Sequence, residues 1–150
     1  MRIAIVALGS RGDVQPYIAL GQGLGDAGHR VRLITHENFA ALAATYGLET
    51  HTVRGDVQAV AESEEMRALL AKGNFLAITR RTAQEAKRAM QHWAEDGLAA
   101  CRGVELIVAG IGGLFIGLAL AEKLDIPLMQ AYLCLLYTSP SPRDRTRYRM

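Results

Sequence analysis

The 150-residue sequence has little of what marks several specialised classes of protein. Its two cysteines, Cys101 and Cys134, are far apart and form no C-x-x-C pair, so we expect neither a disulfide framework nor a thiolate metal site. The four histidines show no metal-binding spacing such as H-x-x-x-H, and no metal is predicted. Aromatic residues make up only 6% of the chain, and no basic stripe is interleaved with them.

The formal charge of +2 is concentrated in residues 134–150. This tail contains four arginines and one aspartate, a local charge of +3, so the remaining residues sum to −1. A nucleic-acid partner is therefore not expected. The tail has two prolines in "SPSP" and no apolar period, which predicts disorder. The string "LLYTSPSPRDRTR" also resembles a translated sequencing adapter, which indicates that the tail is foreign to the gene.

No hydrophobic run is long enough to predict a membrane span or a signal peptide. The run that most resembles a span, residues 106–121, has sixteen uncharged residues, whereas a span needs about 20. We expect instead a strand at 106–109, a glycine turn and a helix at 114–124, with Gly113 and Gly117 allowing that helix to pack closely on the sheet. These features favour a cytoplasmic protein, with peripheral contact to a membrane left open.

Strand and helix patterns alternate through the first 53 residues. The apolar run 2–8 predicts a strand buried on both faces, and a helix is expected from Pro16 to about Gly28. Residues 31–35 and 48–53 predict two more strands, with a helix between them that ends near Gly47. This order predicts an α/β fold: a Rossmann-like parallel sheet with helices on both faces, whose ligands bind at the carboxyl ends of the strands.

A long helix without strand signals is expected before residue 101. Its apolar positions recur at spacings of three and four, which predicts one face packed against the core: Ala86, Met90, Trp93, Gly97 and Cys101. Residues 56–74, before this stripe, are expected to form a helix or an acceptor-side loop.

The loop "GSRGDVQP", residues 9–16, follows the first strand and precedes a helix N-terminus, whose free N–H groups attract negative charge. It is neither the G-x-G-x-x-G dinucleotide fingerprint nor a phosphate-binding P-loop. Asp13 has two interpretations at this stage: a carboxylate that caps the helix, or a functional group. Arg11 similarly suits either a phosphate contact or a surface ion pair.

The stretch "GSRGDVQPYIALGQGLGDAGHRVRLITHENF" resembles the start of the N-terminal domain of glycosyltransferase family 28 and of related sterol and antibiotic glucosyltransferases. Weaker resemblance continues at "YGLETHTVRGD" and "LAEKLDIPLMQAYL". It implies the two-domain GT-B fold, with residues 1–133 as the acceptor-side domain and the C-terminal donor domain absent.

The resemblance also implies a function: inverting transfer of a hexose from a nucleoside diphosphate sugar, UDP-glucose by expectation, to a hydroxyl of a lipid, sterol or other small hydrophobic acceptor. Substrate-binding residues would be Gly9, Ser10, Arg11, Gly12 and Asp13, with Asp13 as the catalytic base and no cofactor besides the sugar nucleotide. Relatives that use a histidine base orient it with an acidic residue after a later strand, but here that place has "VAGIGG".

Two alternatives remain. The chain could be a non-catalytic Rossmann-like binding module, because a donor domain is not part of it. A nicotinamide-dependent oxidoreductase shares the strand–helix–strand start and places Glu37 after the second strand, but the missing G-x-G-x-x-G disfavours this class.

Overall fold

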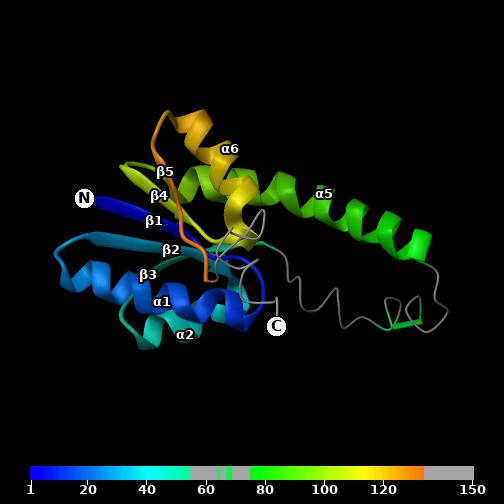
Figure 1. Ribbon diagram of the computed structural model, residues 1–150, viewed down its shortest axis with the longest axis horizontal. Coiled ribbons are helices and arrows are strands. Elements are labelled where there is room, and N and C mark those ends of the chain that lie inside the picture. The colour runs from blue at the N-terminus through cyan, green and yellow to red at the C-terminus, as the bar shows by residue number, and fades with distance from the viewer. Residues whose placement is uncertain (55–63, 65–66, 69–74, 134–150) are drawn as a thin grey trace, which may run out of the picture.

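A computed structural model describes residues 1–54, 64, 67–68 and 75–133. Its centre is a five-stranded parallel sheet in the order β3-β2-β1-β4-β5 (Figure 1). The strands are β1 (Arg2–Val6), β2 (Arg30–His36), β3 (Glu49–Val53), β4 (Leu106–Ala109) and β5 (Leu128–Gln130). The first four were predicted within one or two residues, whereas β5 was not predicted. The tail and nearly all of residues 56–74 lie outside the described residues.

Helices cover both faces of the sheet, as predicted. On one face lie α1 (Arg11–Asp26), the short turn η1 (Glu37–Phe39) and α2 (Ala40–Thr45), and on the other lie α5 (Phe75–Ala100) and α6 (Leu114–Leu124), the latter preceded by η2 (Ile111–Gly113) (Figure 1). Each crossover between neighbouring parallel strands is right-handed in nearly all proteins. The chain moves from β1 toward β3 through α1 and α2, and in the opposite direction along the sheet through α5 and α6. Right-handed crossovers in opposite directions place the two pairs of helices on opposite faces.

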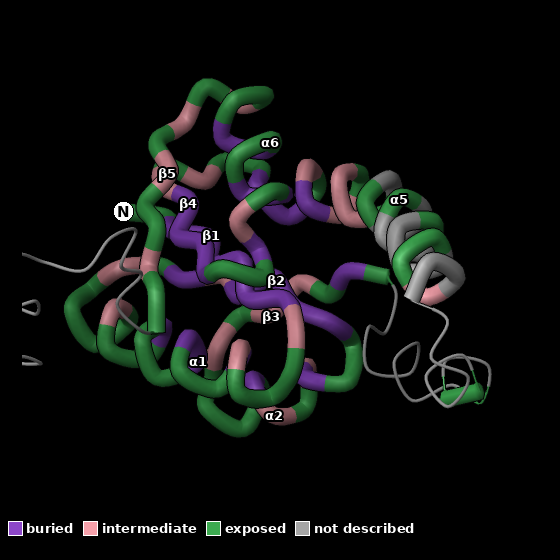
Figure 2. The backbone as a smooth tube through the Cα atoms, turned by 45° about the vertical axis from the view of Figure 1, so that its right-hand side comes forward, coloured by how far each residue is buried: buried purple, intermediate pink, exposed green. Residues whose placement is uncertain are grey.

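The alternation of side chains along β1 builds two cores. Ile3 and Ile5 point into the cluster beneath α1, whereas Ala4 and Val6 point into the cluster beneath α5 and α6. All four are at most 3% exposed, and the strands form the buried centre of the molecule (Figure 2). A continuous apolar run is therefore required here, because a polar residue on either face would lose its hydration without a partner.

Helix α1 begins five residues before the predicted start at Pro16, which was wrong. Ser10 is the N-cap residue and Arg11 the first helical residue, so the middle of the predicted loop forms the first helical turn. Pro16 lies inside the helix, where it lacks the N–H that would bond to the Gly12 carbonyl. The helix loses that one backbone bond and continues.

Helix α5 packs on the sheet only along its C-terminal part. Gly97 and Cys101 are buried and Trp93 is half-buried, as predicted, but Met90 is 48% exposed, so its assignment to the core was wrong. Figure 1 shows the earlier turns of α5 extending beyond the sheet. The side chain of Ala86 lies outside the described part. At Gly97 a β-carbon would come within 2.7 Å of Leu120 Cδ1, which explains why glycine stands where α5 meets α6.

The C-terminal part of α5 is fastened to the end of β3. The backbone N–H and guanidinium of Arg54 donate hydrogen bonds of 3.0–3.1 Å to the carboxylate of Asp96, and the guanidinium also reaches Glu95 at 3.0 Å. Trp93 Nε1 donates to the Arg54 carbonyl at 2.7 Å. The hydrogen bond from the Arg54 side chain lowers the pKa of Asp96 below its ordinary value of 3.8. These contacts fix where the chain leaves the sheet.

The uncharged run at 106–121 forms β4 and most of α6, as predicted, and Gly117 allows the predicted close packing. A β-carbon there would lie 2.9 Å from Ala109 Cβ. Among the described residues, no helix is both long and apolar enough to cross a membrane.

Candidate functional site

A pocket opens at the carboxyl ends of β1 and β4, mostly lined by apolar groups. Its walls come from the β1–α1 junction, the turn after β4 and the segment after β5, and the lining residues are Ala7, Leu8, Asp13, Tyr17, Gly110, Ile111, Gly112, Gly113, Tyr132 and Leu133. The connection that leaves β1 leads to β2 on one side, whereas the connection that leaves β4 leads to β5 on the other, so the strand order reverses between β1 and β4. Ligands of open parallel sheets bind at such switch points.

Asp13 lies in the first turn of α1 and contributes a half-buried carboxylate to the pocket. Its Oδ2 accepts hydrogen bonds from the Ser10 backbone N–H at 2.9 Å and from Ser10 Oγ at 2.8 Å. Its Oδ1 makes no hydrogen bond to any residue within the described ranges. Asp13 thus occupies the third helical position, not the N-cap, and one oxygen stabilises the helix start while the other is available to a ligand.

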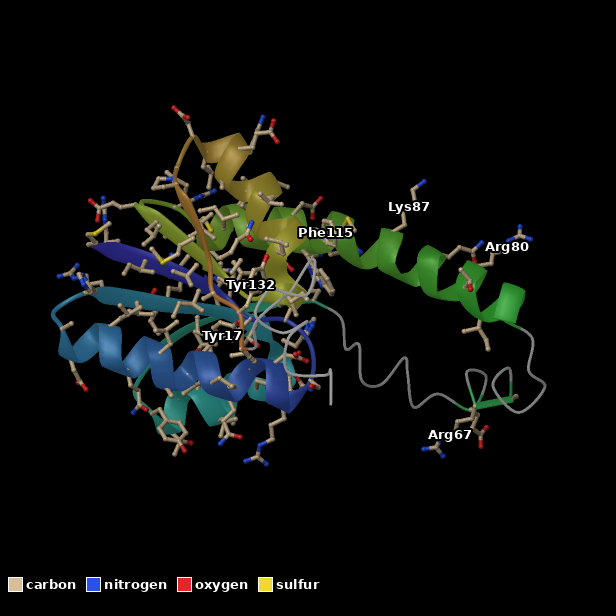
Figure 3. The ribbon with its side chains drawn as sticks, viewed as in Figure 1. Tyr17, Arg67, Arg80, Lys87, Phe115 and Tyr132 are labelled. Carbon is tan, nitrogen blue, oxygen red and sulfur yellow. The ribbon has the colours of Figure 1, made fainter. Side chains whose placement is uncertain are left out.

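Tyr17 lies one helical turn after Asp13 and is only 3% exposed. Its hydroxyl donates a hydrogen bond to the carbonyl of Ala131, which ties α1 to the segment after β5. Burial raises the pKa of Tyr17 above 10.0, and the nearby Asp13 carboxylate adds to that shift. In Figure 3, Tyr17 and Tyr132 lie near each other at this end of the sheet. The tyrosine therefore sets the spacing between two walls of the pocket.

The turn after β4 packs so closely on β1 that side chains are excluded. A β-carbon on Gly110 would lie 2.5 Å from Tyr17 Cζ, one on Gly113 would lie 2.5 Å from the Val6 carbonyl oxygen, and one on Gly112 would overlap the Leu8 carbonyl. The glycines of "VAGIGG" bring backbone, not side chains, to this wall. No acidic residue stands at the place where histidine-base relatives would carry one.

The predicted site residues separate into two groups. Asp13 lines the pocket, Ser10 holds its carboxylate, and Gly9, at φ +135°, would place a β-carbon 2.6 Å from Asp13 Oδ2. Arg11 and Gly12 are exposed on the first helical turn, and Arg11 Nε donates to Gln15 Oε1 at 3.2 Å. Of the two interpretations of Arg11, the surface ion pair is not found among the described residues, where its partner is an amide, and the phosphate contact stays a prediction.

Tyr17, Tyr132 and the glycines after β4 were not predicted as site residues. The glycines carried a usable signal, because they follow a predicted parallel strand at its carboxyl end. Tyr132 carried none, since β5, the strand that precedes it, was not predicted.

Among the described residues, no three histidine, cysteine, aspartate or glutamate side chains are grouped so that they could hold a metal ion. Cys101 is buried on the far side of the sheet from α1, and burial raises its pKa from 9.0 to about 11. His36 is buried and packs against Trp93 with ring centroids 5.3 Å apart. These groups lie in the core and not in the pocket.

The family model of the glycosyltransferase family 28 N-terminal domain matches residues 3–134 of this chain. The chain belongs to this family. It is 37% identical over 149 residues to sterol 3-beta-glucosyltransferase ATG26 of Gibberella zeae, and 33% identical over 148 residues to sterol 3-beta-glucosyltransferase of Pichia angusta. These alignments cover 97% and 96% of this chain but only 9% and 11% of the relatives, so the chain spans about a tenth of their length.

The family match ends at residue 134, whereas an alignment that covers 97% of the chain must extend into residues 134–150. The foreign origin of the tail therefore stays a prediction.

Solved glycosyltransferases have the same fold. Glycosyltransferase SsfS6 of Streptomyces sp. SF2575, complexed with thymidine diphosphate, superposes with a TM-score of 0.67 at 21% identity, over 97% of this chain and 41% of that one. The calicheamicin glycosyltransferase CalG4 gives 0.66 at 16% identity, over 97% of this chain and 34% of that one. The domain described here thus corresponds to one part of a two-domain GT-B glycosyltransferase, as predicted.

Proposed function

We propose that the complete protein is an inverting glycosyltransferase that moves a hexose from a nucleoside diphosphate sugar, UDP-glucose in the first instance, to the hydroxyl of a sterol or other hydroxylated lipid. This chain supplies the acceptor side and the base. The observation that carries the proposal is the Asp13 carboxylate, which has one oxygen held by Ser10 and the other without a hydrogen bond to any described residue, at an apolar pocket. The sterol glucosyltransferases among its relatives support the choice of acceptor.

An alcohol is a weak nucleophile at neutral pH, and a positioned carboxylate solves this difficulty. The acceptor oxygen attacks the anomeric carbon while its proton passes to Asp13 Oδ1. The bond from that carbon to the phosphate oxygen breaks, and the electron pair leaves with the nucleoside diphosphate. A single displacement of this kind inverts the anomeric configuration and requires no resident cofactor.

The apolar lining suits the ring system of a hydrophobic acceptor. Leu8, Ile111 and Leu133 are among the groups that offer such surface, and a ligand that covers them gains about 25 cal/mol for each Å² removed from water. Arg11 is exposed two residues before Asp13, outside the pocket lining, and its guanidinium can exchange its amide contact with Gln15 for a phosphate oxygen of the donor.

Asp13→Asn in the complete enzyme tests the role of the base. Asparagine retains an oxygen that can accept the Ser10 bonds, so folding should be nearly unchanged, whereas kcat should fall by about 10²-fold or more because the proton acceptor is lost. Asp26→Asn, at the exposed far end of α1, is the matched control and should keep the original rate. A near-normal rate for Asp13→Asn at saturating substrates would reduce Asp13 to a capping residue.

The binding-module alternative is tested with the 150-residue chain alone. Because most of the donor site would belong to the missing domain, purified chain should transfer no sugar from a nucleoside diphosphate sugar. Turnover by this chain would overturn its assignment as the acceptor-side part of a larger enzyme. If the complete protein also fails to transfer sugar but binds sterol, the module interpretation is the correct one.

A further inference from the structure

Of the described residues that line the pocket, three carry polar side chains: Asp13, Tyr17 and Tyr132. The hydroxyl of Tyr17 is committed to the fold, because the side chain is buried and donates a hydrogen bond to the Ala131 carbonyl. The carboxylate of Asp13 uses Oδ2 for Ser10 and presents Oδ1 to a ligand. The hydroxyl of Tyr132 is the remaining polar group of this lining.

The position of Tyr132 relative to Asp13 is fixed through Tyr17 and Ala131. Tyr17 lies one helical turn after Asp13 and bonds to the carbonyl of Ala131, the residue before Tyr132. The backbone N–H of Ala131 donates to the Ala109 carbonyl at 3.0 Å, so the segment after β5 stays paired with the end of β4. Burial first, and then the nearby Asp13 and Tyr132, raise the pKa of Tyr17, so both groups lie within electrostatic reach of its hydroxyl. Figure 3 shows the two tyrosines close together.

The hydroxyl of Tyr132 has a partner that it can exchange. The side chain is 37% exposed, and its hydroxyl donates a hydrogen bond to Oε1 of Gln130. Alternation along an extended chain places residues 130 and 132 on the same side, which explains the contact. The Gln130 side chain is exposed, and its amide rotated by half a turn presents Nε2, which donates to the phenol oxygen. The phenol proton is then free for a ligand in the pocket.

We propose that Tyr132 is a second binding residue for the acceptor: its hydroxyl donates a hydrogen bond to the acceptor hydroxyl oxygen, whose own proton points to Asp13 Oδ1. This inference rests on the proposed function and adds the group that orients the reacting hydroxyl. The chain of bonds runs from the Gln130 amide through the phenol and the acceptor to the carboxylate, and bonds in such a chain strengthen one another. As the proton moves to Asp13, negative charge develops on the acceptor oxygen, and the Tyr132 bond stabilises that charge.

Binding to the complete protein without a sugar donor tests the proposal, with two ligands: a sterol, and the same sterol without its hydroxyl. Tyr132→Phe keeps the ring and removes the phenol oxygen, so affinity for the sterol should fall by about fivefold or more, whereas affinity for the deoxy analogue should not change. Tyr46→Phe is the matched control, at an exposed tyrosine, 43% accessible, at the end of α2, and should change neither affinity. An equal loss for both ligands, or no loss for either, would overturn the proposal.

Substitutions of Gln130 separate a donated proton from a tyrosine that is only held in place. Ionised glutamate accepts from the phenol but cannot donate to it, so Gln130→Glu should withhold the proton and weaken sterol binding as much as Tyr132→Phe does. Gln130→Leu removes the acceptor that competes for this proton, so sterol affinity should stay within about twofold of the original. The opposite order, with leucine more damaging than glutamate, would contradict the proposal.

Sugar transfer is measured beside binding, so that this inference and the proposed function fail separately. Absence of transfer by the complete protein would contradict the proposed function, whereas a hydroxyl-dependent effect of Tyr132→Phe on binding would still support the role of Tyr132. Normal transfer, together with an effect of Tyr132→Phe that is equal for both ligands, would contradict the role of Tyr132 alone. A complete protein that binds neither ligand would contradict both.

Discussion

The ring of Tyr17 occupies the space into which any side chain on residue 110 would have to project, with Cζ 2.5 Å from the position of a β-carbon there. Residue 110 has an ordinary φ of −80°, so the requirement for glycine is steric and not conformational. A carboxylate at this place and a tyrosine at position 17 exclude each other. Residue 110 therefore supplies no acidic partner to Asp13, and an aspartate, unlike a histidine, needs none to fix a tautomer.

Replacing Gly110 with alanine should destabilise the protein by about 1–3 kcal/mol, the usual cost of overpacking a filled site. Gly23→Ala is the matched control, because a β-carbon there meets nothing within 4 Å and the residue lies in α1. It should stabilise by about 0.5–1 kcal/mol, as alanine favours a helix over glycine. Denaturant unfolding measures the change in unfolding free energy for both variants. Equal changes would show that the Tyr17 ring moves aside at little cost.

Removing the hydroxyl of Tyr17 with Tyr17→Phe should cost about 1 kcal/mol, since the Ala131 carbonyl loses its donor. The same substitution should not rescue Gly110→Ala, because the ring carbons of a phenylalanine would still lie within 2.7 Å of the added β-carbon. Tyr17→Leu should rescue it in part. A double-mutant cycle on unfolding free energies measures this coupling, and additive effects would contradict the close fit.

The contact between Arg54 and Asp96 should make stability depend on pH in the acid range. Its hydrogen bonds hold the pKa of Asp96 below 3.8, so the folded state binds this proton less tightly than the unfolded state. The stabilisation is therefore present above about pH 4 and is lost as the pH falls through the lowered value. Asp96→Asn should have a lower denaturation midpoint than the original protein at pH 7 and an equal one near pH 2. A difference in denaturation midpoint that persists near pH 2 would show that the substitution acts through packing and not through the charge of Asp96.

Cys101 should be unreactive toward thiol reagents in the folded protein. Burial raises its pKa from 9.0 to about 11, so at pH 9 only about one thiol in a hundred is ionised. In a Cys134→Ser variant, labelling of the native protein at pH 9 should be far slower than after denaturation. Fast labelling in the native state would mean that the C-terminal end of α5 separates readily from the sheet.

The elements that could be predicted are those whose pattern is local. β1, β4 and α6 follow from short apolar runs bounded by glycine or charge, and their bounds needed no knowledge of their neighbours. The start of α1 was misplaced because Pro16 was taken as the signal for the first helical turn. The better signal was Ser10 followed three residues later by Asp13, since the Asp13 carboxylate accepts a hydrogen bond from the backbone N–H of the N-cap Ser10. That spacing was readable in the sequence.

The pocket could not be predicted because it is formed by residues that lie far apart in the sequence. Tyr17 and Gly110 meet only because β4 pairs with β1, with Val6 opposite Ala109, and the sequence pattern does not state that order. Met90 was misassigned for a similar reason: its spacing continues the apolar stripe of α5, but the sheet ends before the helix does. Asp13, by contrast, was placed from its position after the first strand and from the family resemblance.

Arg54 and Asp96, 42 positions apart, are joined by hydrogen bonds of their own groups, to which only Trp93 and Glu95, at the Asp96 end of the segment, add contacts with Arg54. The entropy of closing a loop grows slowly with its length, and a closure fixed by its own side chains leaves the intervening sequence free to change. Insertions early in the segment between the two anchors should therefore leave the sheet that presents Asp13 unchanged. The bonds at Arg54 thus act as a fastening that makes the geometry of the sheet independent of the length of chain that leaves it.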